Sequence, residues 1–214
     1  MAQLTYNPDV FEVADEAAAR RIILDQSFGQ GTDERWARET PYLTDLIGEA
    51  LAPSADQLFI DYGCGIGRMS KALIERFGCR VLGVDLSLRM RDLAPAYVKA
   101  DRFSAVSLPV FRAMVEHGLQ ADGALAIWVL QHCWKPAFDI ALMRGVLRPG
   151  GGLFVANMTG RAVPAVEKAW ASDGIDIREM LRAHLTETRD GALDPTVVDP
   201  ETSQISYWAR YDKA

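Results

Sequence analysis

The central half of the chain alternates two patterns of apolar residues. Short apolar runs predict β-strands, whereas segments with an apolar residue every three or four positions predict helices. We expect strands at 57–61, 80–84, 102–107, 123–128 and 153–157, and helices at 68–77, 87–97, 109–118 and 136–147. Strands that are apolar almost throughout, alternating with amphipathic helices, imply a parallel sheet covered on both faces. The expected fold class is therefore α/β and doubly wound.

The N-terminal part is predicted to be helical. Residues 14–25 favour a helix, residues 28–34 break it, and Thr32 or Asp33 could cap a second, longer helix. Pro41 falls inside this second helix or splits it.

The C-terminal part mixes both patterns. Residues 148–152 (Arg-Pro-Gly-Gly-Gly) form a turn, residues 165–184 favour a helical insertion, and two strands fit at 185–189 and 204–211. The chain has 214 residues and neither a repeat nor a long linker, so we expect a single domain, 1–214.

A glycine-rich loop and a later acid carry the strongest chemical signal. Gly63, Gly65 and Gly67 follow the first predicted strand and precede a helix, and Asp61 opens the loop. Glycines let a ligand approach the backbone N–H groups at a helix start. Asp85 ends the second predicted strand, where a carboxylate can accept hydrogen bonds from both hydroxyls of a ribose. An acid at position 61 also favours a ligand that carries an ammonium group.

On these residues the segment resembles the class I S-adenosylmethionine-dependent methyltransferases, whose first motif is typically acid-x-Gly-x-Gly-x-Gly. The resemblance implies a Rossmann-like, mostly parallel sheet of seven strands with an antiparallel last strand. It implies an N-terminal helical lid at 1–50, a cofactor-binding core at 56–158, a helical insertion at 159–184 and a C-terminal strand pair at 185–214. It covers 56–158 closely and 185–212 loosely.

The resemblance also implies the cofactor, S-adenosylmethionine, with S-adenosylhomocysteine as product and no metal. The cofactor-binding residues that it implies are Asp61, Gly63, Cys64, Gly65, Gly67, Asp85, Leu86, Ser104, Val106, Ile127 and Trp128. One position departs from the family pattern: Ser104 stands where an Asp commonly binds adenine, and Asp101 competes with it if the register differs.

The acceptor side is less constrained. His132 ends a run, Leu-Gln-His, that resembles the Leu-Glu-His of many family members, and it is either a catalytic base or a structural residue. Asn157 and Arg161 follow the fifth strand and could contact a substrate, as could Trp36 from the lid. Tyr42 and Trp170 are further pocket candidates. For Trp36, Tyr42 and Trp170 the alternative is packing in the core, and for Arg161 it is an exposed or structural arginine.

Composition limits the possible partners. The net charge of −6 argues against DNA and disfavours RNA, so we expect a small-molecule acceptor. Three cysteines without a Cys-x-x-Cys pair indicate reduced thiols and no metal site. Neither a signal peptide nor a long apolar run is present, which predicts a cytoplasmic protein that does not enter membranes. Nothing in the sequence indicates the oligomeric state.

The function expected is methyl transfer to a small molecule. The alternative is a protein that binds S-adenosylmethionine or S-adenosylhomocysteine without transferring methyl groups. A nicotinamide oxidoreductase is a third reading, which Arg68 opposes because a dinucleotide loop needs its third glycine at that place. No Asn-Pro-Pro-Tyr motif follows the fourth strand, so the usual signal for adenine or amide nitrogen methylation is absent.

Overall fold

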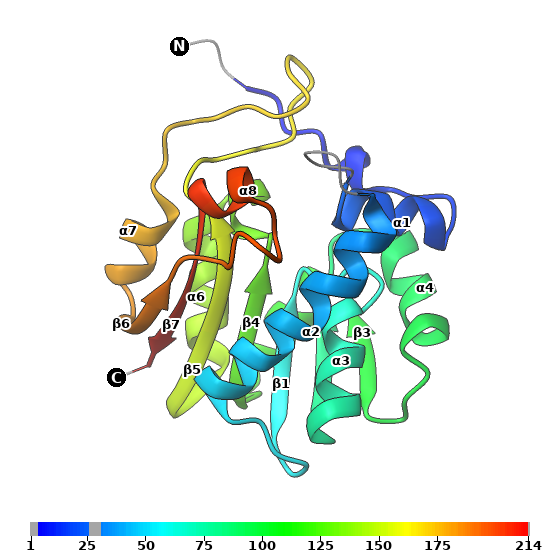
Figure 1. The fold of residues 1–214 in the computed structure, drawn as a ribbon. Helices are drawn as coiled ribbons and strands as arrows, with labels where there is room; N and C mark the ends of the chain where they lie inside the picture. The colour runs from blue at the N-terminus through cyan, green and yellow to red at the C-terminus, as the bar shows by residue number, and fades with distance from the viewer. Residues whose placement is uncertain (1–3, 26–30, 214) are drawn as a thin grey trace.

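A computed structural model describes residues 4–25 and 31–213 and shows a seven-stranded sheet in the order β3-β2-β1-β4-β5-β7-β6 (Figure 1). The strands are β1 (Leu58–Tyr62), β2 (Arg80–Val84), β3 (Phe103–Val106), β4 (Ala121–Ile127), β5 (Leu147–Met158), β6 (Thr186–Gly191) and β7 (Ser206–Asp212). The pairs from β3 to β5 are parallel, and β7 is antiparallel to both of its neighbours. The fold class predicted from the sequence is confirmed.

Helices cover both faces of this sheet. The helical elements of the described residues are η1 (Pro8–Phe11), α1 (Glu16–Ile23), α2 (Thr32–Leu51), α3 (Arg68–Phe77), α4 (Leu88–Val98), α5 (Leu108–Glu116), η2 (Leu130–His132), α6 (Pro136–Val146), α7 (Ile177–Arg182) and α8 (Pro200–Gln204). Side chains of α2 and α3 pack on one face, and those of α5, α6 and α7 pack on the other. The chain order changes direction between β1 and β4, and such a switch point is where open α/β sheets bind ligands.

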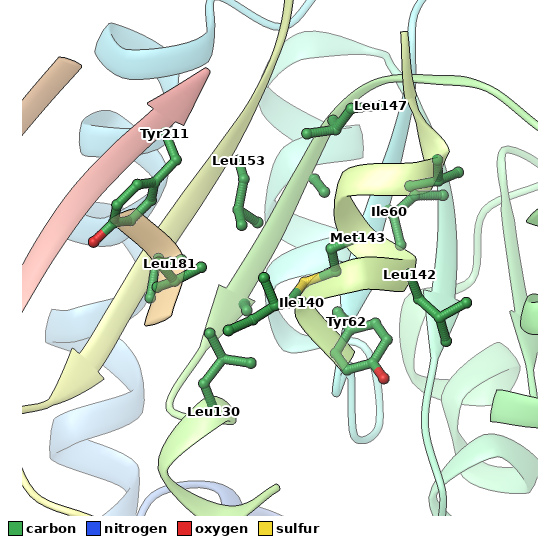
Figure 2. Packing of buried hydrophobic residues seen from close by; sticks show 14 of the residues in the cluster. Ile60, Tyr62, Leu130, Ile140, Leu142, Met143, Leu147, Leu153, Leu181 and Tyr211 are labelled. Carbon is green, nitrogen blue, oxygen red and sulfur yellow. The ribbon is translucent and has the colours of Figure 1, made fainter. Parts of the chain in front are cut away.

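The strands divide their apolar side chains between the two faces. Ile60 and Tyr62 of β1 point into the core beneath α5 and α6, whereas Phe59 points into the core beneath α2 and α3. Figure 2 shows the first of these cores, in which Ile60 and Tyr62 meet Ile140 and Met143 of α6. Side chains alternate along a strand, so a strand buried on both faces must be apolar at consecutive positions.

The predicted helix 165–184 is wrong over most of its length, because only α7 is helical within it. The backbone of Val163 instead pairs with Ala171 through two hydrogen bonds of 2.8 Å each, and Tyr6 forms a bridge to Ala165. Pro164 and Gly174 leave less than three turns between them, too short for a helix to compete with this pairing.

One other local prediction needs correction. The turn at 148–152 lies inside β5 as a break in its register with β4, between the pairs Ala121–Leu147 and Gly123–Gly152. Of the two alternatives for Pro41, the structure has the first: it lies inside α2, which runs unbroken through it. The predicted break at 28–34 lies partly outside the described residues, and Gly31 caps α2.

The N-terminal segment and the segment after β5 both lie above one edge of the sheet (Figure 1). Besides the Tyr6–Ala165 bridge, the N–H of Asn7 donates to the carbonyl of Pro164 at 3.0 Å. Two segments distant in sequence thus cover the edge where the parallel strands end. Among residues 4–25 and 31–213, no helix combines the length and apolar character needed to cross a bilayer.

Candidate cofactor and acceptor site

A cavity of about 500 Å³ lies at the carboxyl ends of the central strands. Its lining comes from the glycine loop, the ends of β2 and β4, the N-terminal segment with α1, and the segments after β5 and before β7. The residues lining it are Tyr6, Phe11, Arg21, Ile22, Ile23, Leu24, Asp25, Arg35, Gly63, Gly65, Asp85, Leu86, Met90, Ile127, Trp128, Val129, Gln131, His132, Cys133, Met158, Ala162, Trp170, Thr202 and Ile205. The cavity lies between the N-terminal helices and the segment after residue 158.

Two of the loop glycines form a floor without side chains. Gly63 has φ 75° and Gly65 has φ 54°, a region that side chains rarely adopt. A Cβ on Gly63 would collide with Val129, and one on Gly65 would lie 2.6 Å from Cδ1 of Ile23 in α1. Both residues line the cavity. The two glycines therefore let the loop pack closely against Val129 and α1, and their backbone lines the cavity.

Asp85 joins the second strand to this loop. Its Oδ2 accepts a hydrogen bond of 2.8 Å from the N–H of Gly65, and its Oδ1 accepts one of 2.9 Å from the N–H of Ser87. Burial raises the pKa of Asp85, and these two hydrogen bonds oppose that shift. A carboxylate oxygen has two lone pairs, so each oxygen can still accept from a ligand hydroxyl in the cavity.

Asp61 is not part of the cavity lining. Its Oδ2 accepts hydrogen bonds from the hydroxyl of Ser70 at 2.6 Å and from the N–H of Ser70 at 3.1 Å. Burial raises the pKa of Asp61 to about 6, against these hydrogen bonds. We therefore assign this acid to the first turn of α3 rather than to a ligand's ammonium group. The spacing of the motif was right, but it could not tell a capping acid from a ligand-binding one.

The other predicted cofactor residues fall into two groups. Leu86, Ile127 and Trp128 line the cavity, and Trp128 has an unusual φ of 59° at the end of β4. Cys64, Gly67, Ser104 and Val106 are not among the lining residues, and their contact with a cofactor stays a prediction.

Register explains the displacement of Ser104. Ser104 pairs with Leu82 and Val106 with Val84, so Ser107 is the residue that follows the strand end as Asp85 does in β2. Ser107 is the N-cap of α5, yet its side chain makes no capping hydrogen bond. A serine before Leu-Pro at a helix start is a cap signal that could have located this strand end.

His132 lines the cavity with a defined tautomer. Its Nδ1 lies 2.6 Å from the carbonyl oxygen of Ala162, which can only accept, so Nδ1 carries the hydrogen and Nε2 carries the lone pair. The side-chain nitrogen of Gln131 lies 3.3 Å from Nε2 of His132. Burial lowers the pKa of His132 and the hydrogen bond to Ala162 opposes it. The ring is thus neutral at pH 7, as a base must be.

The structure does not bring Asn157, Arg161 or Trp36 to the cavity lining. The side-chain oxygen of Asn157 accepts from the N–H of Gln131 at 3.1 Å, and the indole N–H of Trp36 donates to Tyr97 at 3.1 Å. Arg161 is buried and forms an ion pair with Asp173 at 3.0 Å. In this structure their side chains contact other protein groups, and contact of any of them with a substrate stays a prediction.

Arg161 makes the most extensive of these contacts. It donates to the carbonyl of Leu130 at 2.7 Å and to that of Cys133 at 2.6 Å, on either side of His132. Its charge is neutralised by Asp173, so Arg161 cannot serve as a free anion receptor.

Sequence reasoning missed several lining residues. Tyr6 and Phe11 come from a segment with no helix-length pattern, and Gln131 was treated only as part of the run before His132. Arg35 is buried and lines the cavity, where its Nη1 donates to Asp25 at 3.0 Å and its Nε to Glu39 at 2.7 Å. An arginine four residues before a glutamate is normally a surface pair, so no sequence signal distinguished it. Trp170 lines the cavity as predicted, and Tyr42 does not: its hydroxyl accepts from the N–H of Asp194.

Comparison with known proteins agrees with this geometry. Residues 59–151 match a family described as a methyltransferase domain. The O-methyltransferase resE of Aspergillus sclerotiorum is 30% identical over 59% of this chain and 49% of its own length. The ubiquinone biosynthesis O-methyltransferase of Rhizobium johnstonii is 31% identical over 54% of this chain and 47% of its own length. The chain thus matches about half the length of these relatives.

Structural comparison extends over the whole fold. The N-methyltransferase NodS of Bradyrhizobium japonicum, solved with S-adenosyl-L-homocysteine, aligns with a TM-score of 0.65 and 19% identity, covering 99% of each chain. At that identity the likeness concerns the fold. Taken with the family match over the glycine loop and the strand order, it supports a class I S-adenosylmethionine-dependent methyltransferase.

Proposed function

We propose that the chain transfers a methyl group from S-adenosylmethionine to a small molecule bound in the 500 Å³ cavity. The observation that carries the proposal is one cavity lined by two unlike groups. The first is the carboxylate of Asp85, bonded to the N–H of Gly65. The second is His132, with its Nε2 lone pair free of a proton.

The residues present fit the cofactor. Gly63 and Gly65 bring backbone without side chains to the lining, and Asp85 keeps lone pairs for the ribose hydroxyls. Leu86 follows Asp85 and is 46% exposed, which suits the face of an adenine ring.

Catalysis here would rest mainly on alignment. S-adenosylmethionine supplies a methyl group already activated by its sulfonium charge, so little covalent chemistry is left to the protein. Ile127 and Trp128, at the end of β4, line the same cavity and would set the acceptor's approach. The covering segments 4–11 and 158–170 would exclude water.

The choice of acceptor class and location also belongs to the proposal. The net charge of −6 supports a small molecule rather than DNA or RNA. The thiols of Cys64, Cys79 and Cys133 are free, which supports a reducing compartment such as the cytoplasm.

The test is label transfer. Purified protein is incubated with methyl-labelled S-adenosylmethionine and fractionated metabolite extracts, and labelled products are identified by mass spectrometry. We expect label in a small metabolite, and none when Asp85→Ala is used. Tight binding of S-adenosylhomocysteine with no label in any fraction would contradict transfer and favour a protein that only binds the cofactor.

A further inference from the structure

The acceptor half of the cavity carries information on its ligand. We propose that the acceptor is the hydroxyl group of an uncharged aromatic ring, a neutral phenol, whose proton is taken by Nε2 of His132. This inference rests on the proposed function and narrows its substrate class.

Three aromatic rings meet at the acceptor side. The centroid of His132 lies 5.0 Å from that of Trp170 and 6.0 Å from that of Phe11, and Phe11 lies 6.2 Å from Trp170. They come from segments distant in sequence, and all three line the cavity. Edge-to-face and tilted contacts at these distances are those that aromatic rings favour with one another. A flat ring entering the cavity would extend this cluster, with the sulfur of Met158 as a further soft contact.

Charge is missing from the same wall. Among the described residues, segments 4–11 and 158–170 contribute no charged side chain to the lining. Their charges are used elsewhere: Arg161 is paired with Asp173, and Glu167 accepts from the N–H of Thr5 at 2.9 Å. A phosphate or carboxylate next to His132 would lose its water without gaining a cation from these segments, a cost that a neutral ring avoids.

The charged lining residues come from other segments. Asp85 is bonded to the glycine loop, and Arg35 is paired with Asp25 at 3.0 Å, whose charge also acts on His132. Arg21, on the exposed side of α1, also lines the cavity, and it supplies a direct control for an anionic acceptor.

The base selects among hydroxyl groups. A buried, neutral imidazole is a weak base, so it assists only an acceptor that is fairly acidic, and a phenol at about pKa 10 is far closer to it than an alkanol. In the transfer step the bond between the phenol oxygen and the methyl carbon forms as the carbon–sulfur bond breaks. The electron pair of that bond stays on sulfur, which becomes the neutral thioether of S-adenosylhomocysteine, and the phenol proton passes to Nε2 of His132.

The experiment uses a panel of neutral phenols of one to three rings with methyl-labelled S-adenosylmethionine. Each phenol is matched with its ring-saturated alcohol and with a counterpart bearing a ring carboxylate. We expect O-methylation of neutral phenols. For both counterparts kcat/KM should be at least about tenfold lower, since one lost ring contact, or one charge buried without a partner, is worth that much. Phe11→Leu and Trp170→Leu should raise KM for the phenol about three- to tenfold without changing the Kd of S-adenosylhomocysteine.

The matched control is Phe138→Leu, a phenylalanine 39% exposed and outside the cavity lining, which should change neither constant. Label on an amine, a carbon or an alkanol in preference to phenols would overturn the phenol proposal and leave methyl transfer standing. The same holds for a carboxylate-dependent acceptor whose methylation is lost in Arg21→Ala. Binding of the cofactor with no phenol labelled also overturns it, whereas failure to bind either sulfur nucleoside refutes the proposed function itself.

Discussion

The carboxylate of Asp85 is bonded to the backbone of Gly65 at 2.8 Å, which ties the acid at the end of β2 to the glycine loop after β1. Two sequence signals twenty residues apart are therefore one structural unit. The acid both shapes the loop and faces the cavity, so its replacement affects the loop and the ligand together.

Asp85→Ala should weaken binding of S-adenosylhomocysteine by about 1.5–3 kcal/mol for each charge-assisted hydrogen bond lost. Asp85→Asn should lose less, because one acceptor oxygen survives. Calorimetry gives the affinities, with Asp101→Ala, an exposed acid in the turn before β3, as the control. Unchanged affinity in Asp85→Ala, with an unchanged melting temperature, would refute the ribose assignment.

Asp61→Asn should leave the affinity for S-adenosylhomocysteine within about threefold, because Asp61 is bonded to Ser70 and does not line the cavity. Its effect should appear in stability. The pKa of Asp61 is raised to about 6, above its usual value, so the folded state binds the proton more tightly than the unfolded chain between about pH 4 and pH 6. The contribution of this carboxyl to the free energy of unfolding of the wild type therefore falls as pH rises through that window.

The asparagine variant lacks this loss. Its free energy of unfolding, relative to that of the wild type, should therefore increase by about 2–3 kcal/mol from pH 4 to pH 6. Urea unfolding of both proteins across that range measures the difference. If the difference in free energy of unfolding does not change with pH, or if the variant loses much of its cofactor affinity, Asp61 would instead be a ligand-binding residue.

Arg161→Met should destabilise the fold by about 3–5 kcal/mol, because it leaves Asp173 without its cation and two carbonyls beside His132 without a donor. Thermal unfolding is the measurement. The double variant Arg161→Met with Asp173→Asn should recover part of the loss. A stable Arg161→Met protein with only a raised acceptor KM would instead assign Arg161 to the substrate.

His132→Gln should lower kcat by about 10²–10⁴ if His132 is the general base. Wild-type kcat/KM should be high where the ring is neutral and fall as pH drops through the pKa of His132. Burial lowers this pKa below its usual value, with Arg161 lowering it further and the Ala162 carbonyl and Asp25 raising it, so activity should persist below pH 6.5. Exposed His117, on α5, provides the control variant His117→Gln.

Rates and melting temperatures of His132→Gln must be measured on the same samples. Reduced stability with an unchanged rate per folded molecule, and a pH profile like that of the wild type, would make His132 structural.

The sheet could be predicted because its signals are local. Largely apolar strands such as Leu58–Tyr62, with Gly78 ending α3 and Ser87 capping α4, specify their elements without tertiary information. The segment 159–176 could not be predicted in this way. Its conformation depends on pairing of Val163 with Ala171 and of Tyr6 with Ala165, contacts that no periodicity reveals.

The same distinction between local signals and tertiary contacts applies to the residues of the site. Gly63, Gly65, Asp85 and His132 were found because spacing around strand ends places them at one edge of the sheet. Ser104 was displaced by register, and the roles of Asp61, Asn157 and Arg161 depend on where each side chain points. Such direction is set by partners like Ser70 and Asp173, which sequence spacing does not give.

The central claim is that this cavity binds a sulfur nucleoside rather than a dinucleotide. Calorimetric titration of the intact chain with S-adenosylhomocysteine, and separately with NAD, tests it most directly. The account predicts micromolar binding of S-adenosylhomocysteine, weakened in Asp85→Ala, and no heat with NAD. Micromolar binding of NAD together with no binding of S-adenosylhomocysteine or S-adenosylmethionine would contradict it.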